Sequence, residues 1–244
     1  MKSRVRLVSS IKKSKRQKAI IISIISVVVL VIGFLASFET LENLFAGKVV
    51  DQAMTDVKRN KAKQKHKASF NFEKVEEISP SSLAKAYAHR NDYRPVGQIV
   101  IRKLSMRLNI YQGVGNVELN LGAGTMKPGQ EMGKQNYALA GHNMHDHRYF
   151  SNLYWGRQNG TLGGTTVYLT DYKKVYYYTI ESSSFIRRNR VDLIKNNPEF
   201  EKKPVLSMFT CDWTGAGRLF VIARLTGFQE IDCVSKDIRK SFSF

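Results

Sequence analysis

The chain has 244 residues and a formal net charge of +19, so it accommodates one or two domains and carries a strongly basic surface. Its two cysteines, Cys211 and Cys233, are too few for a small secreted domain built on disulfide bonds. The basic excess suits an anionic neighbourhood such as a cell wall or lipid headgroups, and no nucleic-acid-binding motif is visible, so we expect no nucleic acid partner.

The N-terminus is predicted to anchor the chain in a membrane. Residues 1–18 contain eight cations and no acid, and residues 19–38 contain no charge and only three serines as polar side chains. A helix of that length spans about 30 Å, the thickness of a bilayer core. The cations before it predict a cytoplasmic tail at residues 1–18, a single span at 19–38 and an extracellular remainder. The alternative is a cleaved signal peptide, whose apolar region is usually shorter.

The next segment, residues 39–69, is predicted to be a basic stalk or linker. Its run at residues 58–67 contains six cations and no acid. Such a block repels itself and stays solvated. We therefore place the extracellular domain at residues 70–244, a length that can bury a sizeable apolar core.

The extracellular domain has the pattern of a β-protein. Ser79 and Pro80 indicate the start of a short helix through residues 83–88. From Gly97 onward, short apolar or alternating runs are separated by glycine-rich breaks, which favours an antiparallel barrel or sandwich. The candidate strands are residues 98–101, 106–110, 136–142, 165–170, 175–184, 205–211 and 218–228. Further short helices are expected around residues 149–154 and 191–195.

Three side chains at predicted strand ends could together carry acyl transfer. They are the thiol of Cys211, the imidazole of His142 and the guanidinium of Arg218, which provide a nucleophile, a proton carrier and a cation for a developing oxyanion. Taken singly, each has a simpler explanation as a buried small residue, a structural histidine or a solvated strand end. Their combination favours a catalytic site. A disulfide between Cys211 and Cys233 would block the nucleophile, so we expect both thiols to be free.

A metal site is the competing interpretation of the histidine-rich stretch. His142, His145, Asp146 and His147 are plausible ligand types. However, His145 and His147 fall in a loop beyond the strand, and no matching ligand spacing occurs elsewhere in the sequence. We therefore expect no metal ion.

Several segments, in the same order along the chain, resemble class A sortases, the cell-wall transpeptidases of Gram-positive bacteria. The match covers about residues 70–230. The matching segments are residues 97–101 and 108–113 (first two strands), 121–125 (glycine-rich turn), 138–143 (histidine strand), 207–211 (Thr-Leu-x-Thr-Cys motif) and 218–221 (arginine strand).

The resemblance implies a fold and a reaction. The fold would be a closed eight-stranded β-barrel with a few short helices, preceded by one transmembrane helix and a stalk. Cys211 would attack the carbonyl between Thr and Gly of a Leu-Pro-x-Thr-Gly sorting signal and form a thioester. His142 would act as general acid and base, and Arg218 would stabilise the oxyanion and the substrate. The protein would then pass to a free amine of a peptidoglycan precursor, which anchors surface proteins to the cell wall.

The resemblance also implies substrate contacts. Residues 182–203 would wall the groove for the sorting signal. The expected substrate-binding residues are Thr210, Ala140, Gly141, Met208, Ile186, Val191 and Ile194.

The sequence departs from the family pattern in ways that concern packing and cofactors. Arg102 and Asn109 stand where the family often has proline, and Ser207 and Met208 begin the cysteine motif. Some members bind calcium through acids between the glycine-rich turn and the histidine strand. Here that stretch, residues 126–134, contains one acid. Calcium takes six to eight oxygen ligands, so we expect no calcium activation and no other cofactor.

Two alternatives of other kinds remain open. An L,D-transpeptidase also uses Cys and His on the cell wall, but it has a histidine beside the cysteine, where this chain has Phe209-Thr210-Cys211-Asp212. A non-catalytic wall-binding barrel would not need Cys211 for its function.

Overall fold

The computed structural model describes residues 2–56, 67–144 and 147–242. The chain divides into two units, residues 1–44 and a compact unit over Phe45–Phe244. Residues 2–44 belong to helix α1 (Lys2–Asp56). No helix in the described part of the chain has both the length and the hydropathy that a membrane span requires.

The last turns of α1 belong to the compact unit. Their buried side chains recur at helical spacing, which gives an apolar stripe that packs into the core. These side chains are Ala46, Val49, Val50, Ala53 and Met54. The carbonyl of Ala53 accepts a hydrogen bond of 2.9 Å from Nδ2 of the buried Asn109. The folded unit thus begins well before the predicted boundary at residue 70.

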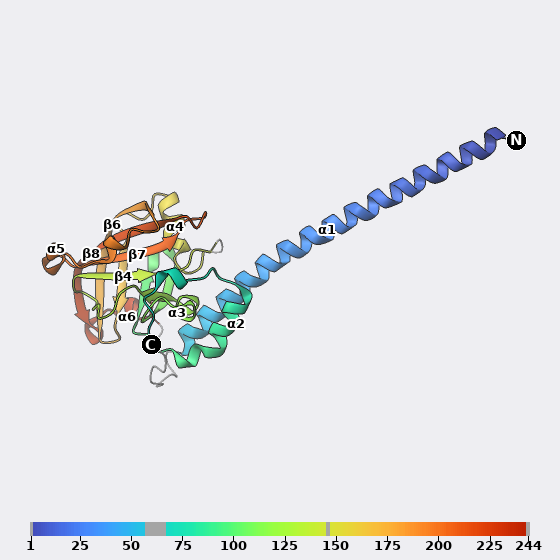
Figure 1. Cartoon of the computed structure of the whole chain (residues 1–244). Coiled ribbons are helices and arrows are strands. Elements are labelled where there is room, and N and C mark those ends of the chain that lie inside the picture. Colours follow the sequence, from blue (N-terminus) through green and yellow to red (C-terminus); the bar gives the residue numbers. More distant parts are fainter. Residues whose placement is uncertain (1, 57–66, 145–146, 243–244) are drawn as a thin grey trace. The chain divides into compact units, whose positions relative to one another are not determined.

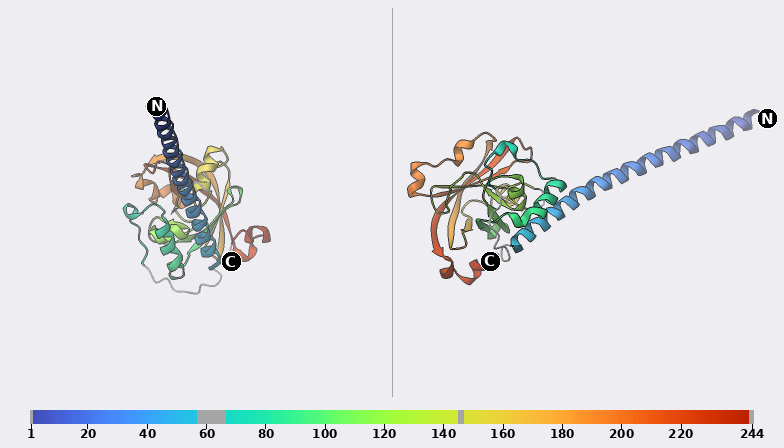
Figure 2. Two further views of the ribbon diagram at one scale, coloured as in Figure 1. Left: turned by 90° about the vertical axis from the view of Figure 1, so that its right-hand side faces the viewer. Right: turned by 60° about the horizontal axis from the view of Figure 1, so that its bottom comes forward.

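Residues 45–56 of the predicted stalk at 39–69 therefore belong to the compact unit. The basic run that motivated it lies, apart from Lys67, outside the described residues. Figures 1 and 2 show helix α2 (Pro80–His89) beside the last turns of α1. An ion pair of 2.8 Å between Arg90 Nε and Asp56 Oδ2 joins the two segments. The N-cap of α2 is Ser79, with Pro80 in its first turn, as the sequence predicts.

Eight strands form a closed barrel, which confirms the predicted architecture (Figure 1). Their order around the barrel is β1-β2-β3-β4-β7-β8-β6-β5. The strands are β1 (Gly97–Ile101), β2 (Met106–Tyr111), β3 (Ala123–Thr125), β4 (Asn136–Ala140), β5 (Thr166–Thr170), β6 (Lys174–Arg187), β7 (Val205–Cys211) and β8 (Gly217–Glu230).

The strand pattern alone favoured an antiparallel barrel or sandwich, but the observed barrel also contains parallel strand pairs. The pairs β2–β3 and β4–β7 are parallel. Parallel neighbours need a crossover connection. Helix α3 (Asn116–Leu121) provides it between β2 and β3, and the β5–β6 hairpin lies between β4 and β7 in the chain. Strand β3 has three residues within the predicted glycine-rich turn, which is too short to give a periodic signal.

The remaining helices are short and decorate the barrel. The helices expected around residues 149–154 and 191–195 correspond to α4 (Ser151–Gln158) and the 3-10 helix η4 (Val191–Ile194). Strand β6 continues to Arg187, so the connection before β7 is shorter than the predicted 182–203. The others are α5 (Pro198–Lys202), α6 (Lys236–Arg239), and the 3-10 helices η1 (Phe72–Lys74), η2 (Arg90–Asp92), η3 (Arg102–Leu104) and η5 (Ile231–Cys233).

Candidate active site

The parallel pairing of β4 with β7 brings His142 and Cys211 to the same end of the barrel. The last pair in this register is Ala140 with Phe209, and the amide of Gly141 donates a hydrogen bond of 3.1 Å to the carbonyl of Phe209. Extending the register by two residues matches His142 with Cys211. Both residues therefore stand at the carboxyl ends of adjacent parallel strands.

The antiparallel pairing on the other side of β7 adds Arg218. Cys211 is the direct cross-strand partner of Arg218 on β8, and Arg218 is the partner of Ile186 on β6. Directly opposite residues of adjacent strands place their side chains on the same face of a sheet. One row across three strands thus contains Ile186, Arg218 and Cys211.

All three predicted catalytic side chains line one groove of about 670 Å³. This volume lies within the range of about 300–1,000 Å³ that is usual for ligand sites. Most of the predicted substrate-binding residues line the same groove. They are Thr210, Ala140, Gly141, Ile186, Val191 and Ile194.

Met208 is the exception among the predicted substrate contacts. Its side chain is fully buried in the main apolar core and does not line the groove. Successive side chains of a strand point to opposite faces, so the neighbouring Phe209 lines the groove instead. The prediction for Met208 is therefore wrong.

The structure adds groove residues that the sequence did not indicate. Val114, Leu119 and Met126 come from β2, α3 and β3 or the connections after them, and a second group comes from the segment before α2. That segment contributes Phe70, Asn71, Phe72 and Val75. It lies next to the predicted linker and has no strand or helix periodicity, so no sequence signal marked it.

His142 is held in an apolar setting beside the cysteine strand. Its ring meets the ring of Tyr149 edge-on at 5.7 Å, and its carbonyl accepts a hydrogen bond of 3.0 Å from the amide of Phe150. The next residue, Asn143, donates a hydrogen bond of 2.7 Å from Nδ2 to the carbonyl of Cys211. Burial disfavours the charged imidazolium and lowers the pKa of His142 to about 4.

The surroundings of Cys211 have opposing effects on the pKa of its thiol. Burial raises the pKa of the Cys211 thiol, and the Arg218 guanidinium partly offsets this by favouring the thiolate. The nearby carboxylates of Asp212 and Glu77 raise the pKa further. Nη1 of Arg218 donates hydrogen bonds of 3.0 and 2.7 Å to the carbonyls of Gly215 and Gly217, which fix the guanidinium against the β7–β8 loop.

Thr210 is a groove-lining residue whose side-chain hydroxyl is buried. The residue is almost fully buried, and its Oγ1 has no hydrogen-bond partner in the described part of the chain. Buried hydroxyl groups are nearly always bonded.

The far wall of the groove, formed by η4, is fastened from two directions. Nζ of Lys127 donates to the carbonyl of Ile194 at 2.8 Å and to Oδ1 of Asn196 at 2.5 Å. Nδ2 of Asn136, at the start of β4, donates to the carbonyls of Leu193 and Lys195 at 2.8 and 3.2 Å. These bonds hold Val191 and Ile194 at the groove.

The other expectations concern metal binding and disulfides. Across the described residues, no three His, Cys, Asp or Glu side chains are placed to hold a metal ion. Of the histidine-rich stretch, residues 145–146 lie outside the described ranges. Cys211 and Cys233 are both free thiols, and Cys233 is exposed on η5.

Comparisons with known proteins agree with this geometry. Residues 99–226 match the family model of the sortase domain. Sortase A of Streptococcus agalactiae is 36% identical over 189 residues, which cover 77% of this chain and 74% of the relative. Sortase A of Listeria monocytogenes is 31% identical over 195 residues, which cover 77% of this chain and 83% of the relative.

The chain belongs to the sortase family.

The structural comparison gives the same result for this sortase. The crystal structure of Listeria monocytogenes sortase A superposes with a TM-score of 0.53 at 28% identity, covering 61% of this chain and 96% of that one. Sortase C-3 of Streptococcus pneumoniae gives a TM-score of 0.53 at 16% identity, which shows the shared fold alone. The relatives identify a class A sortase, a cysteine transpeptidase that sorts proteins to the cell wall. The L,D-transpeptidase and the non-catalytic barrel are not favoured.

Proposed function

We propose that this sortase cleaves a Leu-Pro-x-Thr-Gly sorting signal between Thr and Gly and transfers the new carboxyl end to an amine of a peptidoglycan precursor. The observation that supports this assignment is the meeting of Cys211, His142 and Arg218 in one groove. Adjacent strands β4, β7 and β8 supply the three residues in fixed register. A rigid scaffold of this kind holds reacting groups in place before the substrate arrives.

The reaction proceeds in two acyl transfers. The Cys211 thiolate attacks the threonine carbonyl carbon, and Arg218 stabilises the negative charge that develops on the carbonyl oxygen. The bond to glycine breaks as the His142 imidazolium gives its proton to the leaving amine. The acceptor amine then attacks the thioester and loses a proton to His142, and the Cys211 thiolate leaves.

The protonation states of Cys211 and His142 determine what fraction of the enzyme is in the reactive thiolate–imidazolium form. With ordinary pKa values of about 8.5 and 6.5, the thiolate–imidazolium pair has a weight of about 1% relative to the neutral pair. Burial raises the pKa of Cys211 and lowers that of His142, so it makes the charged pair rarer in the free enzyme. Arg218 acts against this by stabilising the thiolate.

The groove walls supply the binding energy for the sorting signal. Ile186, Val191 and Ile194 offer apolar contacts, and Ala140 and Gly141 line the groove at the end of β4. Sorting signals of surface proteins and the free amine of a peptidoglycan precursor are the two substrates. We propose that neither calcium nor another cofactor takes part.

We also propose that the enzyme is a single-pass membrane protein with a cytoplasmic N-terminus. Residues 19–38 carry no charge, and eight cations precede them. The large apolar side chains of α1 between Ile20 and Phe34 are at least half exposed. Such a surface suits lipid better than water. The catalytic domain then lies outside the cell, next to the wall.

One experiment tests the proposed reaction. The full chain in detergent is incubated with a Leu-Pro-x-Thr-Gly peptide library and triglycine, and the products are identified by mass spectrometry. We expect peptides cut after Thr and joined to triglycine. Cys211→Ala is expected to abolish turnover, while the matched Cys233→Ala keeps it. Turnover by Cys211→Ala, or no cleavage of any peptide by the native chain, would refute the proposal.

A further inference from the structure

The segment just before α2, residues 69–76, is tied to the barrel at both ends. The carbonyl of Ser69 accepts a hydrogen bond of 2.7 Å from the amide of Val114. The amide of Glu76 donates one of 3.0 Å to Oδ1 of Asn116. Val114 lies in the connection between β2 and α3, and Asn116 is the first residue of α3. The residues between the two ties are therefore held in one place.

A glycine makes the first tie possible. Gly113 has φ of +98°, and a Cβ at this position would lie only 2.7 Å from the carbonyl oxygen of Ser69. Any other residue would be strained and would also push the segment away. The close approach of residues 69–76 to the barrel is thus built into the β2–α3 connection.

Between the ties, the segment presents side chains to the groove. Phe72 and Val75 line it, and both pack on a buried apolar cluster that includes Val114, Leu119 and Phe209. Leu193 and Ile194 pack on the same cluster from the connection before β7. The groove therefore has one apolar wall from η4 and a second from residues before α2.

The segment borders the groove and does not fill it. About 670 Å³ remains open with the segment in place. That space is sufficient for a short peptide, because ligand sites of about 300–1,000 Å³ are usual. Two ties to the barrel also distinguish residues 69–76 from a loosely held plug.

We propose that residues 69–76 form a fixed wall of the sorting-signal groove, in which Phe72 and Val75 contact the apolar residues of the signal. This inference rests on the proposed function, since it assigns further residues to the same substrate. The few residues that dominate an interface cluster near its centre, and truncating one of them costs more than about a factor of five in affinity. We expect Phe72→Ala to weaken peptide binding about tenfold and Val75→Ala about threefold.

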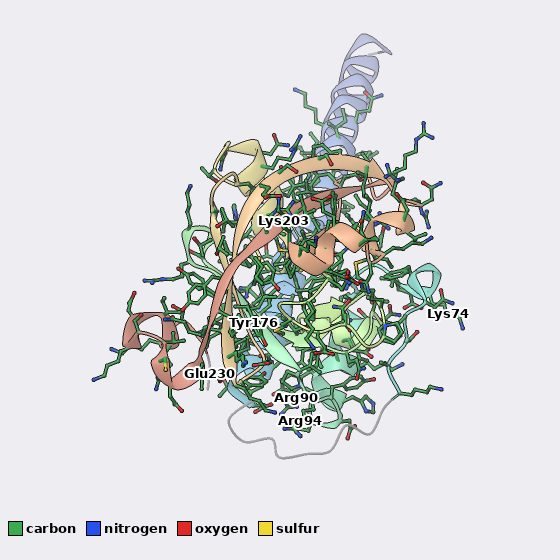
Figure 3. All side chains as sticks on the ribbon, turned by 90° about the vertical axis from the view of Figure 1, so that its left-hand side faces the viewer. Lys74, Arg90, Arg94, Tyr176, Lys203 and Glu230 are labelled. Carbon is green, nitrogen blue, oxygen red and sulfur yellow. The ribbon has the colours of Figure 1, made fainter. Side chains whose placement is uncertain are left out.

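Binding is measured without turnover, so that the wall and the reaction are tested separately. The full chain with Cys211→Ala is titrated against a fluorescein-labelled Leu-Pro-x-Thr-Gly peptide, and Kd is read from anisotropy. Phe72→Ala and Val75→Ala are added in turn. Lys74→Ala is the matched control, because Lys74 lies on the same turn, is exposed, and stands at the periphery of the compact unit (Figure 3). Phe72→Leu keeps an apolar side chain and should restore most of the affinity.

A second measurement distinguishes a wall from a cover. Alkylation of Cys211 by iodoacetamide is followed in a Cys233→Ala background, with and without Phe72→Ala. A wall predicts an unchanged alkylation rate together with the weaker Kd. Faster alkylation with tighter peptide binding would show that the segment covers the groove, and would overturn the proposal. Equal Kd values for Phe72→Ala and Lys74→Ala would also overturn it.

The two proposals can fail independently. If the native chain cleaves no sorting-signal peptide but Phe72→Ala still weakens peptide binding tenfold relative to Lys74→Ala, the reaction is wrong and the wall stands. If the native chain cleaves the peptide and Phe72→Ala binds it as tightly as the control does, the reaction stands and the wall is wrong.

Discussion

Nζ of Lys127 donates a hydrogen bond of 2.8 Å to the carbonyl oxygen of Ile194, and this bond joins the segment before β4 to the η4 wall of the groove. Asn196 accepts a second hydrogen bond from the same ammonium group. Burial lowers the pKa of Lys127, because the ammonium is partly withdrawn from water. Lys127 and Asn136 together therefore hold the η4 wall of the groove.

Replacing Lys127 should loosen this wall. We expect Lys127→Met to raise KM for a sorting-signal peptide roughly three- to tenfold with little change in kcat. The groove wall binds the substrate and the transition state equally, and the reacting groups are unchanged in the variant. Lys134→Met is the control, because Lys134 is exposed in the same connection and pairs with the exposed Glu131. An equal KM for the two variants would contradict this role of Lys127.

Calcium should have no effect on turnover. Residues 126–134 contain one acid, Glu131, and its carboxylate already pairs with Lys134 at 2.6 Å. Calcium sites need six to eight oxygen ligands. We expect kcat/KM to be the same with millimolar calcium and with a strong chelator. A severalfold stimulation by calcium would refute this expectation.

Arg218 should control how easily Cys211 loses its proton. The guanidinium lowers the thiol pKa against the raising effect of burial, so Arg218→Gln is expected to shift that pKa upward. At a given pH below the pKa, the variant would then hold less thiolate. The pH dependence of iodoacetamide alkylation, measured with Cys233→Ala, reports the midpoint. A midpoint that stays the same or moves down would argue against this role.

His142 should make the folded state sensitive to acid. The pKa of His142 falls from an ordinary value of 6.5 to about 4 on folding. Between these two pH values the imidazole is protonated in the unfolded state and mostly neutral in the folded state. Stability from this group is complete above pH 6.5 and decreases by about 3 kcal/mol as the pH falls to 4. Urea unfolding of residues 45–244 at pH 7 and pH 4 should show a smaller loss in His142→Gln. An equal loss in both proteins would contradict the lowered pKa of His142.

The last turns of α1 should contribute to the stability of the catalytic unit. Val49 is completely buried, and we expect Val49→Ala to lower the free energy of unfolding by roughly 2 kcal/mol because it leaves a cavity. Lys48→Ala, one residue away and exposed, should change it by less than about 0.5 kcal/mol. Equal stabilities would restore the interpretation of this segment as a linker.

Much of the barrel could be predicted because its strands have strong local signals. The alternation at Met106, Leu108 and Ile110 and the apolar run that ends at Cys211 gave strands close to their observed bounds. Strand β3 has no such pattern because three residues are too few. Met208 was misplaced because its position in a motif does not say which face of β7 it occupies. The strand neighbours around it decide that.

The reactive groups were predictable from the residue order alone: a thiol, an imidazole and a guanidinium, each at the end of a predicted strand, in a chain that resembles sortases. Their meeting in one groove followed from the fold, because the β4–β7 register is a long-range pairing that no local pattern specifies. The same holds for the walls. Lys127, Phe72 and the last turns of α1 act through contacts with residues distant in the chain, and such contacts exist only once the barrel has closed.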